Sequence, residues 1–475
     1  MNIKLLKNPV GIAISLIVAL AIPVLYFSLF VHFEADTGDS VMHYFYARYA
    51  PQNPLLYLHH WAKPVFTLLA SPFAQFGFAG MKLFNGIAGL LSAWFAFCVA
   101  RKLGLKHSWL AIIFVMFAPA YFVKLFSGYT EPLFGLIFIA SVYLVLVQKP
   151  FHASVLLSFL PFVRSEGLIL IMVFALYYLI KKRFWAIVLL TTGHVVYAVI
   201  GFFAGKSLLW MFTEIPYSVI SAYGKGNLMH YPNQMLLTLG VPLFMLFIVG
   251  TCILLASLAV KKIEAISNYS LELNLLIFGS FLAYFLFHTI SWGFGLFGSM
   301  GLNRILIAMV PLLSIISLVG FNFLIGWKYI GRFPYHALVY VPIIGYILIF
   351  PFLHNPASIN FEKELCRSPE MKLMHSIASD LQKHYKDKFL YYSNPYLSYA
   401  LNINHFDSSK HLCFTDWQAS KNLHPNSLVI WDNWFSVVEE RTDSTMLIQN
   451  PELRLLNRYE IEGLNSKNIF LVFGN

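Results

Sequence analysis

Charged residues are scarce in this sequence. Only 12% of its 475 residues are Asp, Glu, Lys or Arg, whereas 58% are hydrophobic. Because a soluble globular domain carries roughly a quarter of its residues as charges, this composition excludes an ordinary soluble protein. Apolar runs long enough to cross a bilayer recur through the first three quarters of the chain. The sequence therefore predicts a multi-span membrane protein.

Acidic residues are fewer than basic ones, 22 against 33, which gives a formal net charge of +11. In a membrane protein this excess does not indicate nucleic-acid binding, because Lys and Arg gather in short loops where they set the topology. We therefore expect membrane lipids, and no nucleic acid, among the partners.

Cysteine is rare, and no set of Cys and His residues has the spacing of a zinc site. Cys98 and Cys252 lie in apolar runs and are predicted to be core thiols. Cys366 and Cys413 lie in the C-terminal part, where they would pair only in an oxidising compartment. The sequence leaves a disulfide between them open.

The apolar runs predict about eleven spans. Basic residues precede the first run and no small-residue cleavage site is evident, so we expect an uncleaved signal anchor. The predicted spans are 10–31, 81–99, 108–124, 131–147, 152–163, 167–180, 184–204, 235–259, 272–292, 304–326 and 335–353.

The loops between these spans alternate in character. One set is short and basic, as in Arg101-Lys102 and Lys181-Lys182-Arg183, so we expect it and the N-terminus to be cytoplasmic. The other set includes the long loops 32–80 and 205–234 and everything after 354. These segments are predicted to face the periplasm or a lumen.

The run 152–163 is short, about 18 Å as a helix against a hydrocarbon core of about 30 Å. A fusion with 167–180 into one kinked span is the alternative. That fusion would bury Arg164 and Glu166 in mid-membrane and would put the later basic loops outside, against the positive-inside rule. We therefore expect two short helices that meet at an outer turn.

Beyond about residue 354 the composition becomes polar. The pattern predicts two helices, at 370–385 and near 435–442, and four strands, at 388–392, 427–431, 453–459 and 469–473. No Gly-rich phosphate loop follows any of these strands. The predicted fold is mainly α: a polytopic helical bundle over 1–353, with interfacial helices in the first outer loop, and a small outer α/β domain over 354–475.

The first outer loop carries two carboxylates in a tight turn, Asp36 and Asp39. Asp39 is expected to begin a helix and to cap its first amide groups. On that helix His43 and Tyr46 share the face of Asp39, and a carboxylate beside an imidazole at the membrane edge is a candidate acid–base site. The alternative is that Asp39 only caps the helix and the aromatic side chains anchor it at the interface.

Further charged residues map to the same outer face. Each has a structural alternative: a snorkelling lysine, a first-turn acid, a mutual ion pair across a turn, or an interfacial anchor. Together they stand out, since the mid-span positions are almost uncharged, whereas a transporter carries polar residues near the midplane. These residues are Lys63, Glu131, Arg164, Glu166 and Arg304.

This pattern resembles the GT-C class of membrane glycosyltransferases, which includes protein O-mannosyltransferases and lipid A aminoarabinose transferases. The resemblance covers about residues 10–330. It lies in the helix Asp39-Ser-Val-Met-His-Tyr-Phe-Tyr-Ala-Arg48, in Lys63-Pro64, in Thr130-Glu131-Pro132, in Arg164-Ser-Glu-Gly167 and in Arg304 with Pro311. The chain departs from the class at Ser40, where a second acidic residue is usual.

The resemblance implies transfer of a sugar from a polyprenyl-phosphate donor to the hydroxyl of a protein, lipid or glycan acceptor, at the outer face of a bacterial cytoplasmic membrane. It implies that Asp39 is the general base and that Lys63, Arg304 and Arg164 contact the donor phosphate. Alternatives are a flippase or transporter of lipid-linked sugars and a non-catalytic envelope assembly subunit.

Other residues of the outer face receive supporting roles. Asp36 and Glu131 would orient the acceptor or hold a divalent cation, since hard cations prefer carboxylate oxygens. His43 and Glu166 are expected to contact substrate.

Overall fold

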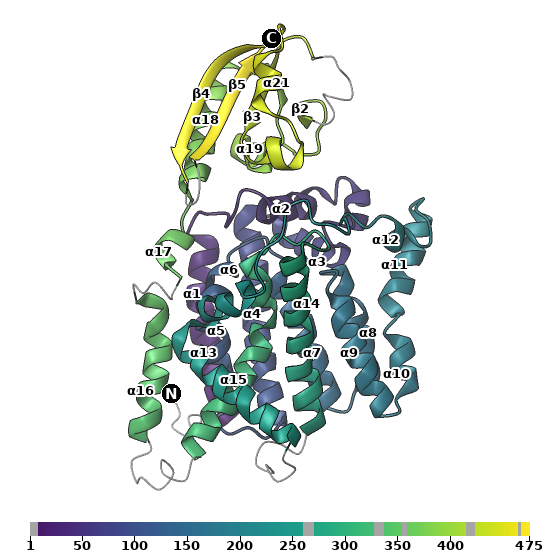
Figure 1. The fold of residues 1–475 in the computed structure, drawn as a ribbon, viewed down its shortest axis with the longest axis vertical. Coiled ribbons are helices and arrows are strands. Elements are labelled where there is room, and N and C mark those ends of the chain that lie inside the picture. The colour runs from purple at the N-terminus through teal and green to yellow at the C-terminus, as the bar shows by residue number, and fades with distance from the viewer. Residues whose placement is uncertain (1–7, 260–269, 327–336, 354–358, 415–422, 464–466) are drawn as a thin grey trace.

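The computed structural model describes residues 8–259, 270–326, 337–353, 359–414, 423–463 and 467–475. Helices stand side by side as a bundle, and a small sheet domain sits at one end of it (Figure 1). This arrangement confirms the predicted fold class, a polytopic helical bundle with a C-terminal α/β part.

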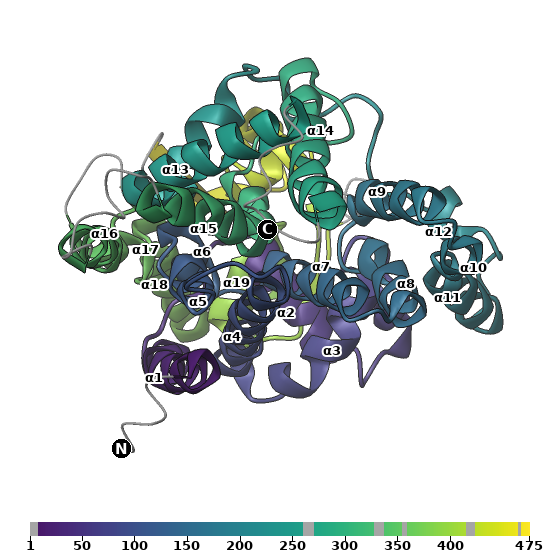
Figure 2. The same cartoon turned by 90° about the horizontal axis from the view of Figure 1, so that it is seen from below.

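Six described helical segments are long and apolar enough to span a membrane. In the perpendicular view α15 lies near the middle of the bundle and α1 at its edge (Figure 2), and their most apolar windows are 94% and 17% buried. The six segments are α1 (Pro9–Leu29), α4 (Gly77–Lys102), α10 (Phe184–Leu189) with α11 (Thr192–Phe203), α13 (His230–Ala259), η4 (Glu272–Gly279) with α14 (Ser280–Phe294), and η5 (Asn303–Met309) with α15 (Val310–Gly326).

The other predicted spans are shorter or broken. The prediction of one continuous span over 108–124 is wrong, because Ala118 has an extended backbone (φ −69°, ψ 112°) before Pro119. A residue before proline disfavours the helical region, so the helix stops there. The resulting elements are α5 (Leu110–Met116) and α6 (Pro119–Lys124), and the remaining short helices are α7 (Glu131–Leu146), α8 (Pro150–Ser158) with η3 (Leu160–Phe162), α9 (Gly167–Ile180), and α16 (Ala337–Ile349) with η6 (Phe350–Phe352).

The first outer loop forms helices that lie at the end of the bundle nearest the sheet domain (Figure 1). They are α2 (Asp39–Tyr49), η2 (Pro54–Leu58) and α3 (Pro64–Ala74). Proline occupies the first position of α3, where its missing amide proton costs nothing. Two predicted helices in this loop are thus present, and the loop 205–234 adds the short helix α12 (Trp210–Thr213).

The C-terminal sheet has five strands in the order β2-β1-β3-β5-β4. β1 pairs in parallel with β2 and β3, whereas β5 pairs antiparallel with β3 and β4. The four predicted strands and the first predicted helix are present. The elements are α17 (Phe361–Glu364), α18 (Pro369–His384), β1 (Phe389–Tyr391), α19 (Pro395–Leu401), β2 (His411–Leu412), β3 (Ser427–Asp432), η7 (Phe435–Glu439), α21 (Ser444–Ile448), β4 (Arg454–Glu462) and β5 (Lys467–Gly474).

Short elements of this domain escaped prediction, namely α19, β2 and α21, because each is too short for a periodic pattern. The cysteines also need one correction. Cys252 is exposed on the outside of α13, so it is not a core thiol; in a membrane bundle an apolar run can face lipid. Cys366 is an exposed free thiol, so it forms no disulfide with Cys413 in the structure.

Candidate active site

The turn before α2 presents its two aspartates differently. Oδ1 of Asp36 accepts hydrogen bonds from the backbone amides of Gly38 (3.1 Å) and Ser40 (2.8 Å). Asp39 is the first residue of the helix and forms an ion pair with Arg304. The prediction that Asp39 caps α2 is therefore wrong, since Asp36 performs that function. The carboxylate of Asp39 is directed to Arg304 instead.

Arg304 lies at the centre of a cluster of charged side chains that includes Asp36, Asp39 and Glu131. Its Nη1 is 3.0 Å from Oδ2 of Asp36, its Nη2 pairs with Asp39, and its Nε is 3.2 Å from Oε1 of Glu131. The guanidinium also lies over the ring of Tyr129, 4.2 Å from the ring centroid, and the Tyr129 hydroxyl donates to Oδ2 of Asp36 (2.7 Å). A planar fork of donors suits such multiple pairing.

Arg164 extends the network from the turn between η3 and α9. Its Nη1 is 2.7 Å from Oε1 of Glu131, and its Nη2 is 2.9 Å from Oε1 of Glu166. Nη1 also donates to the hydroxyl of Thr130 (3.0 Å). That hydroxyl caps no amide of α7. Glu131, 1% exposed, is shared by the two arginines.

Lys63 is buried, with 5% of its surface exposed. Its Nζ donates to the hydroxyl of Ser165 (2.8 Å) and lies 5.1 Å from the ring centroid of Tyr217. Among the described residues no carboxylate is within ion-pair distance of this ammonium group. Burial lowers the pKa of Lys63 to about 7, against the attraction of Glu166. The burial excludes the snorkelling alternative.

His43 lies one helical turn after Asp39. Its ring stacks on Trp61, with ring centroids 4.7 Å apart, and its buried Nδ1 has no hydrogen-bond partner among the described residues. Burial lowers the pKa of His43 to about 3, although the nearby charge of Asp39 opposes that effect. The imidazole is therefore neutral near pH 7.

The two aspartates are the accessible acids of the cluster. Their side chains are 30% (Asp36) and 37% (Asp39) exposed, whereas Glu131 is 1% exposed. Burial raises the pKa of Asp36, and the charge of Asp39 adds to that effect against Arg304. Burial also acts to raise the pKa of Asp39, but the charge of Arg304 and its hydrogen bond to the carboxylate lower the value. Asp39 is therefore the more readily ionised of the pair.

A divalent cation does not fit this donor set. The carboxylates of Asp36, Asp39 and Glu131 all turn to one guanidinium, that of Arg304. In the part of the chain that the structure describes, no group of three or more His, Cys, Asp or Glu side chains is arranged to hold a metal ion.

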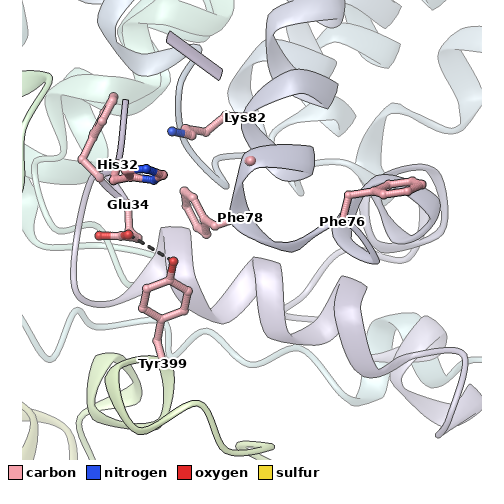
Figure 3. A pocket seen from close by; sticks show the side chains of 8 residues that line it. His32, Glu34, Phe76, Phe78, Lys82 and Tyr399 are labelled. Atoms are coloured by element: carbon pink, nitrogen blue, oxygen red, sulfur yellow. Dashed lines mark hydrogen bonds between the residues drawn. The ribbon is translucent and has the colours of Figure 1, made fainter. Parts of the chain in front are cut away.

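A pocket of about 200 Å³ opens beside the same turn (Figure 3). Asp39 does not line this pocket, and two of the polar side chains that do line it already form hydrogen bonds. Lys82 donates to the carbonyl oxygens of Phe27 (3.2 Å) and Val31, and Glu34 accepts from the Tyr399 hydroxyl (3.1 Å). The lining residues are His32, Phe33, Glu34, Phe76, Phe78, Ala79, Lys82 and Tyr399.

The structure thus brings the predicted residues together at one end of the bundle. Contacts join Asp36, Asp39, Glu131, Arg164, Glu166 and Arg304, and Lys63 and His43 lie alongside. Sequence reasoning missed Tyr129, Ser165 and Tyr217 as members. Tyr129 is next to a predicted motif and Ser165 lies within one, so their positions in the sequence were a usable signal. Tyr217 lies in the aromatic-rich outer loop 205–234, which was the only signal for it.

No family model and no curated protein sequence matches this chain. Solved structures do match. ArnT from Cupriavidus metallidurans bound to undecaprenyl phosphate aligns with a TM-score of 0.57, at 12% identity, over 96% of this chain and 97% of that chain. The chain has the fold of ArnT. The apo state of ArnT gives the same score and coverage at 13% identity, and the match agrees with the fold that the GT-C resemblance implies.

Proposed function

We propose that this chain is a membrane glycosyltransferase that moves a sugar from a polyprenyl-phosphate donor to an acceptor hydroxyl. The ArnT fold supports the class, and undecaprenyl phosphate is bound in one ArnT structure. The observation that carries the proposal is Lys63, a buried ammonium group without a carboxylate partner among the described residues. A buried charge is costly unless an opposite charge joins it, and a lipid phosphate supplies that charge.

The transfer is a single displacement in this proposal. The acceptor oxygen attacks the anomeric carbon of the sugar while Asp39 takes the hydroxyl proton. The bond between that carbon and the phosphate oxygen breaks, and its electron pair leaves with the polyprenyl phosphate. Lys63, Arg164 and Arg304 stabilise the charge that grows on the leaving phosphate.

Arg304 links donor binding to the strength of the base. In the structure it lowers the pKa of Asp39, which favours ionisation but weakens proton affinity. When the donor phosphate also bonds the guanidinium of Arg304, the ion pair between Arg304 and Asp39 becomes weaker. The pKa of the Asp39 carboxylate therefore rises as the donor binds. Glu131 keeps the guanidinium groups of Arg164 and Arg304 close despite their like charge.

The remaining predicted residues orient the reactants. Asp36 fixes the first turn of α2. His43 offers a neutral ring with a free Nδ1 for a substrate hydroxyl, and Glu166 holds Arg164 in place. We place this reaction at the periplasmic side of a bacterial inner membrane, with the N-terminus cytoplasmic and the sheet domain outside. Labelling of single cysteines at the exposed positions Ser207 and Ser408 from outside intact cells tests that orientation.

Mass spectrometry of envelope lipids and glycans, with and without the protein, should identify the sugar and the acceptor. Purified protein should then transfer that sugar from a synthetic polyprenyl-phosphate donor and release the polyprenyl phosphate. A wild-type protein that neither binds undecaprenyl phosphate nor changes any envelope glycan would overturn the proposal.

A further inference from the structure

Glu34 is held by the sheet domain rather than by the bundle. Its side chain is 2% exposed. Arg367 donates to both carboxylate oxygens, from Nε (3.1 Å) and Nη2 (2.9 Å). The hydroxyls of Tyr396 (2.6 Å) and Tyr399 (3.1 Å) donate to the same carboxylate. Figure 3 shows the Tyr399 side chain meeting Glu34 from the C-terminal part of the chain.

Four hydrogen bonds to one buried carboxylate make a strong and directional contact, because bonds to an ionised acceptor are roughly twice as strong as neutral ones. All three partners are more than 330 residues away in the sequence. The contact therefore does not stabilise a local helix; it fixes one point of the first outer loop against the sheet domain.

The chain between Glu34 and the aspartates leaves little freedom. Ala35 has a left-handed backbone (φ 72°), which is uncommon for a residue other than glycine. The carbonyl oxygen of Glu34 accepts from the Ser40 hydroxyl (2.6 Å), and Asp36 accepts from the Ser40 amide. A shift at Glu34 is thus transmitted directly to the turn that presents Asp36 and Asp39.

The same serine bonds this turn to the loop that precedes α7. Oγ of Ser40 accepts from the backbone amide of Gly128 (2.8 Å), one residue before Tyr129. A Cβ atom at Gly128 would lie 2.0 Å from the carbonyl oxygen of Ser40, so glycine permits the close approach. The turn is held from two sides, by the sheet domain through Glu34 and by the bundle through Gly128.

We propose that Glu34 is a positioning residue through which the sheet domain holds Asp36 and Asp39 in register with Arg304. The contact of Glu34 with Arg367, Tyr396 and Tyr399 is called here the Glu34 latch. The inference rests on the proposed function, since it assigns the sheet domain a part in catalysis. Without the latch the carboxylates would sample positions away from the acceptor, and a displacement of about 1 Å can cost roughly 100-fold in rate.

The test uses the full-length protein and the variants Glu34→Gln and Tyr399→Phe, with Glu452→Gln, an exposed acid of the same domain, as the matched control. Hydrogen exchange should become faster at the amides of Gly38 and Ser40 in Glu34→Gln and stay unchanged in α4 and α7. For transfer, kcat should fall about 10- to 100-fold while the KM for the donor changes less than twofold. Tyr399→Phe, which removes one bond, should fall between Glu34→Gln and the control.

Two results would overturn the latch: unchanged exchange at Gly38 and Ser40 in Glu34→Gln, or a loss of activity matched by faster exchange across the whole bundle. Should Glu34→Gln fail to fold, Tyr399→Phe and Arg367→Lys carry the same test. Exchange is measured without substrate, so it judges the latch even where the wild-type protein transfers no sugar. Absent transfer by the wild type would instead count against the proposed function.

Discussion

Two carboxylate–arginine clusters lie on the same short turn, and they differ in how completely their charges are matched. At Glu34 one carboxylate receives four hydrogen bonds and is 2% exposed. At Arg304 three carboxylates share one guanidinium, and two of them remain about a third exposed. The Lys63 ammonium nearby bonds to a hydroxyl and has no carboxylate within ion-pair distance among the described residues. The closed cluster fits a structural contact, whereas the open one retains the capacity to bind an anion and to take up a proton.

The sharpest way to break the open cluster is Asp39→Asn. The substitution keeps the shape but removes the proton acceptor, and general base contributions are about 100- to 10,000-fold in rate. Since Asp39 caps no amide of α2, the melting temperature should change by only a few degrees. Sugar transfer by the purified variant decides the matter. Near-normal turnover would show that Asp39 is not the base and would direct attention to Asp36 and Glu131.

Lys63→Met should have the next largest effect. It keeps the buried stem and removes the charge, and a hydrogen bond to a charged group contributes roughly 1.5–3 kcal/mol. Affinity for undecaprenyl phosphate should therefore fall about 10- to 100-fold, while Lys102→Met, an exposed lysine at the end of α4, serves as the control. Equal affinity of both variants for undecaprenyl phosphate would show that Lys63 has only a structural role.

The pH dependence of donor binding sharpens the contrast further. Burial lowers the pKa of Lys63 to about 7, and a bound phosphate would raise it, so binding takes up a proton above pH 7. Affinity should be highest below pH 7 and fall by up to about tenfold per pH unit above it. A polyprenyl phosphodiester keeps one constant charge over this range and is the suitable probe. Lys63→Met should give a flat profile, and a flat profile in the wild type would contradict the assignment.

The contrast between the clusters also explains what the sequence could reveal. In a chain with few charges, each ionisable residue at the outer ends of spans stands out, which is why Asp39, Lys63, Arg164 and Arg304 were identifiable. Their pairing was not. Asp36 and Asp39 are three residues apart before one helix, and local pattern cannot tell which side chain turns back to cap it.

The long-range partners of these residues could not be predicted from the sequence either. Glu34 lies two residues before Asp36, yet its partners lie in a domain more than 330 residues later. Tyr217, whose ring centroid lies 5.1 Å from the Lys63 ammonium group, comes from a loop without regular pattern. The break in the span 108–124, by contrast, was readable from Pro119. Sequence thus indicates candidate residues, and tertiary contacts decide which of them meet.

The smallest expected effect, and the most diagnostic in sign, comes from Asp36→Asn. Burial raises the pKa of Asp36, so its ionised form is disfavoured in the folded protein relative to the unfolded chain. Stability is then lost as pH rises through that range, and neutralising Asp36 should leave the melting temperature at pH 7 unchanged or slightly higher, because the amide oxygen still caps α2. The lowered pKa of Asp39 has the opposite sign: its charge stabilises the fold above its unfolded pKa, and Asp39→Asn should lower the melting temperature slightly. Transfer by Asp36→Asn should fall only several-fold, far less than in Asp39→Asn, since the cap remains and only one contact to Arg304 loses its charge.

Thermal unfolding of both variants at pH 7, together with their turnover, tests this ordering. If both variants shift the melting temperature equally, with the same sign, and lose the same amount of rate, the two aspartates act as one interchangeable pair.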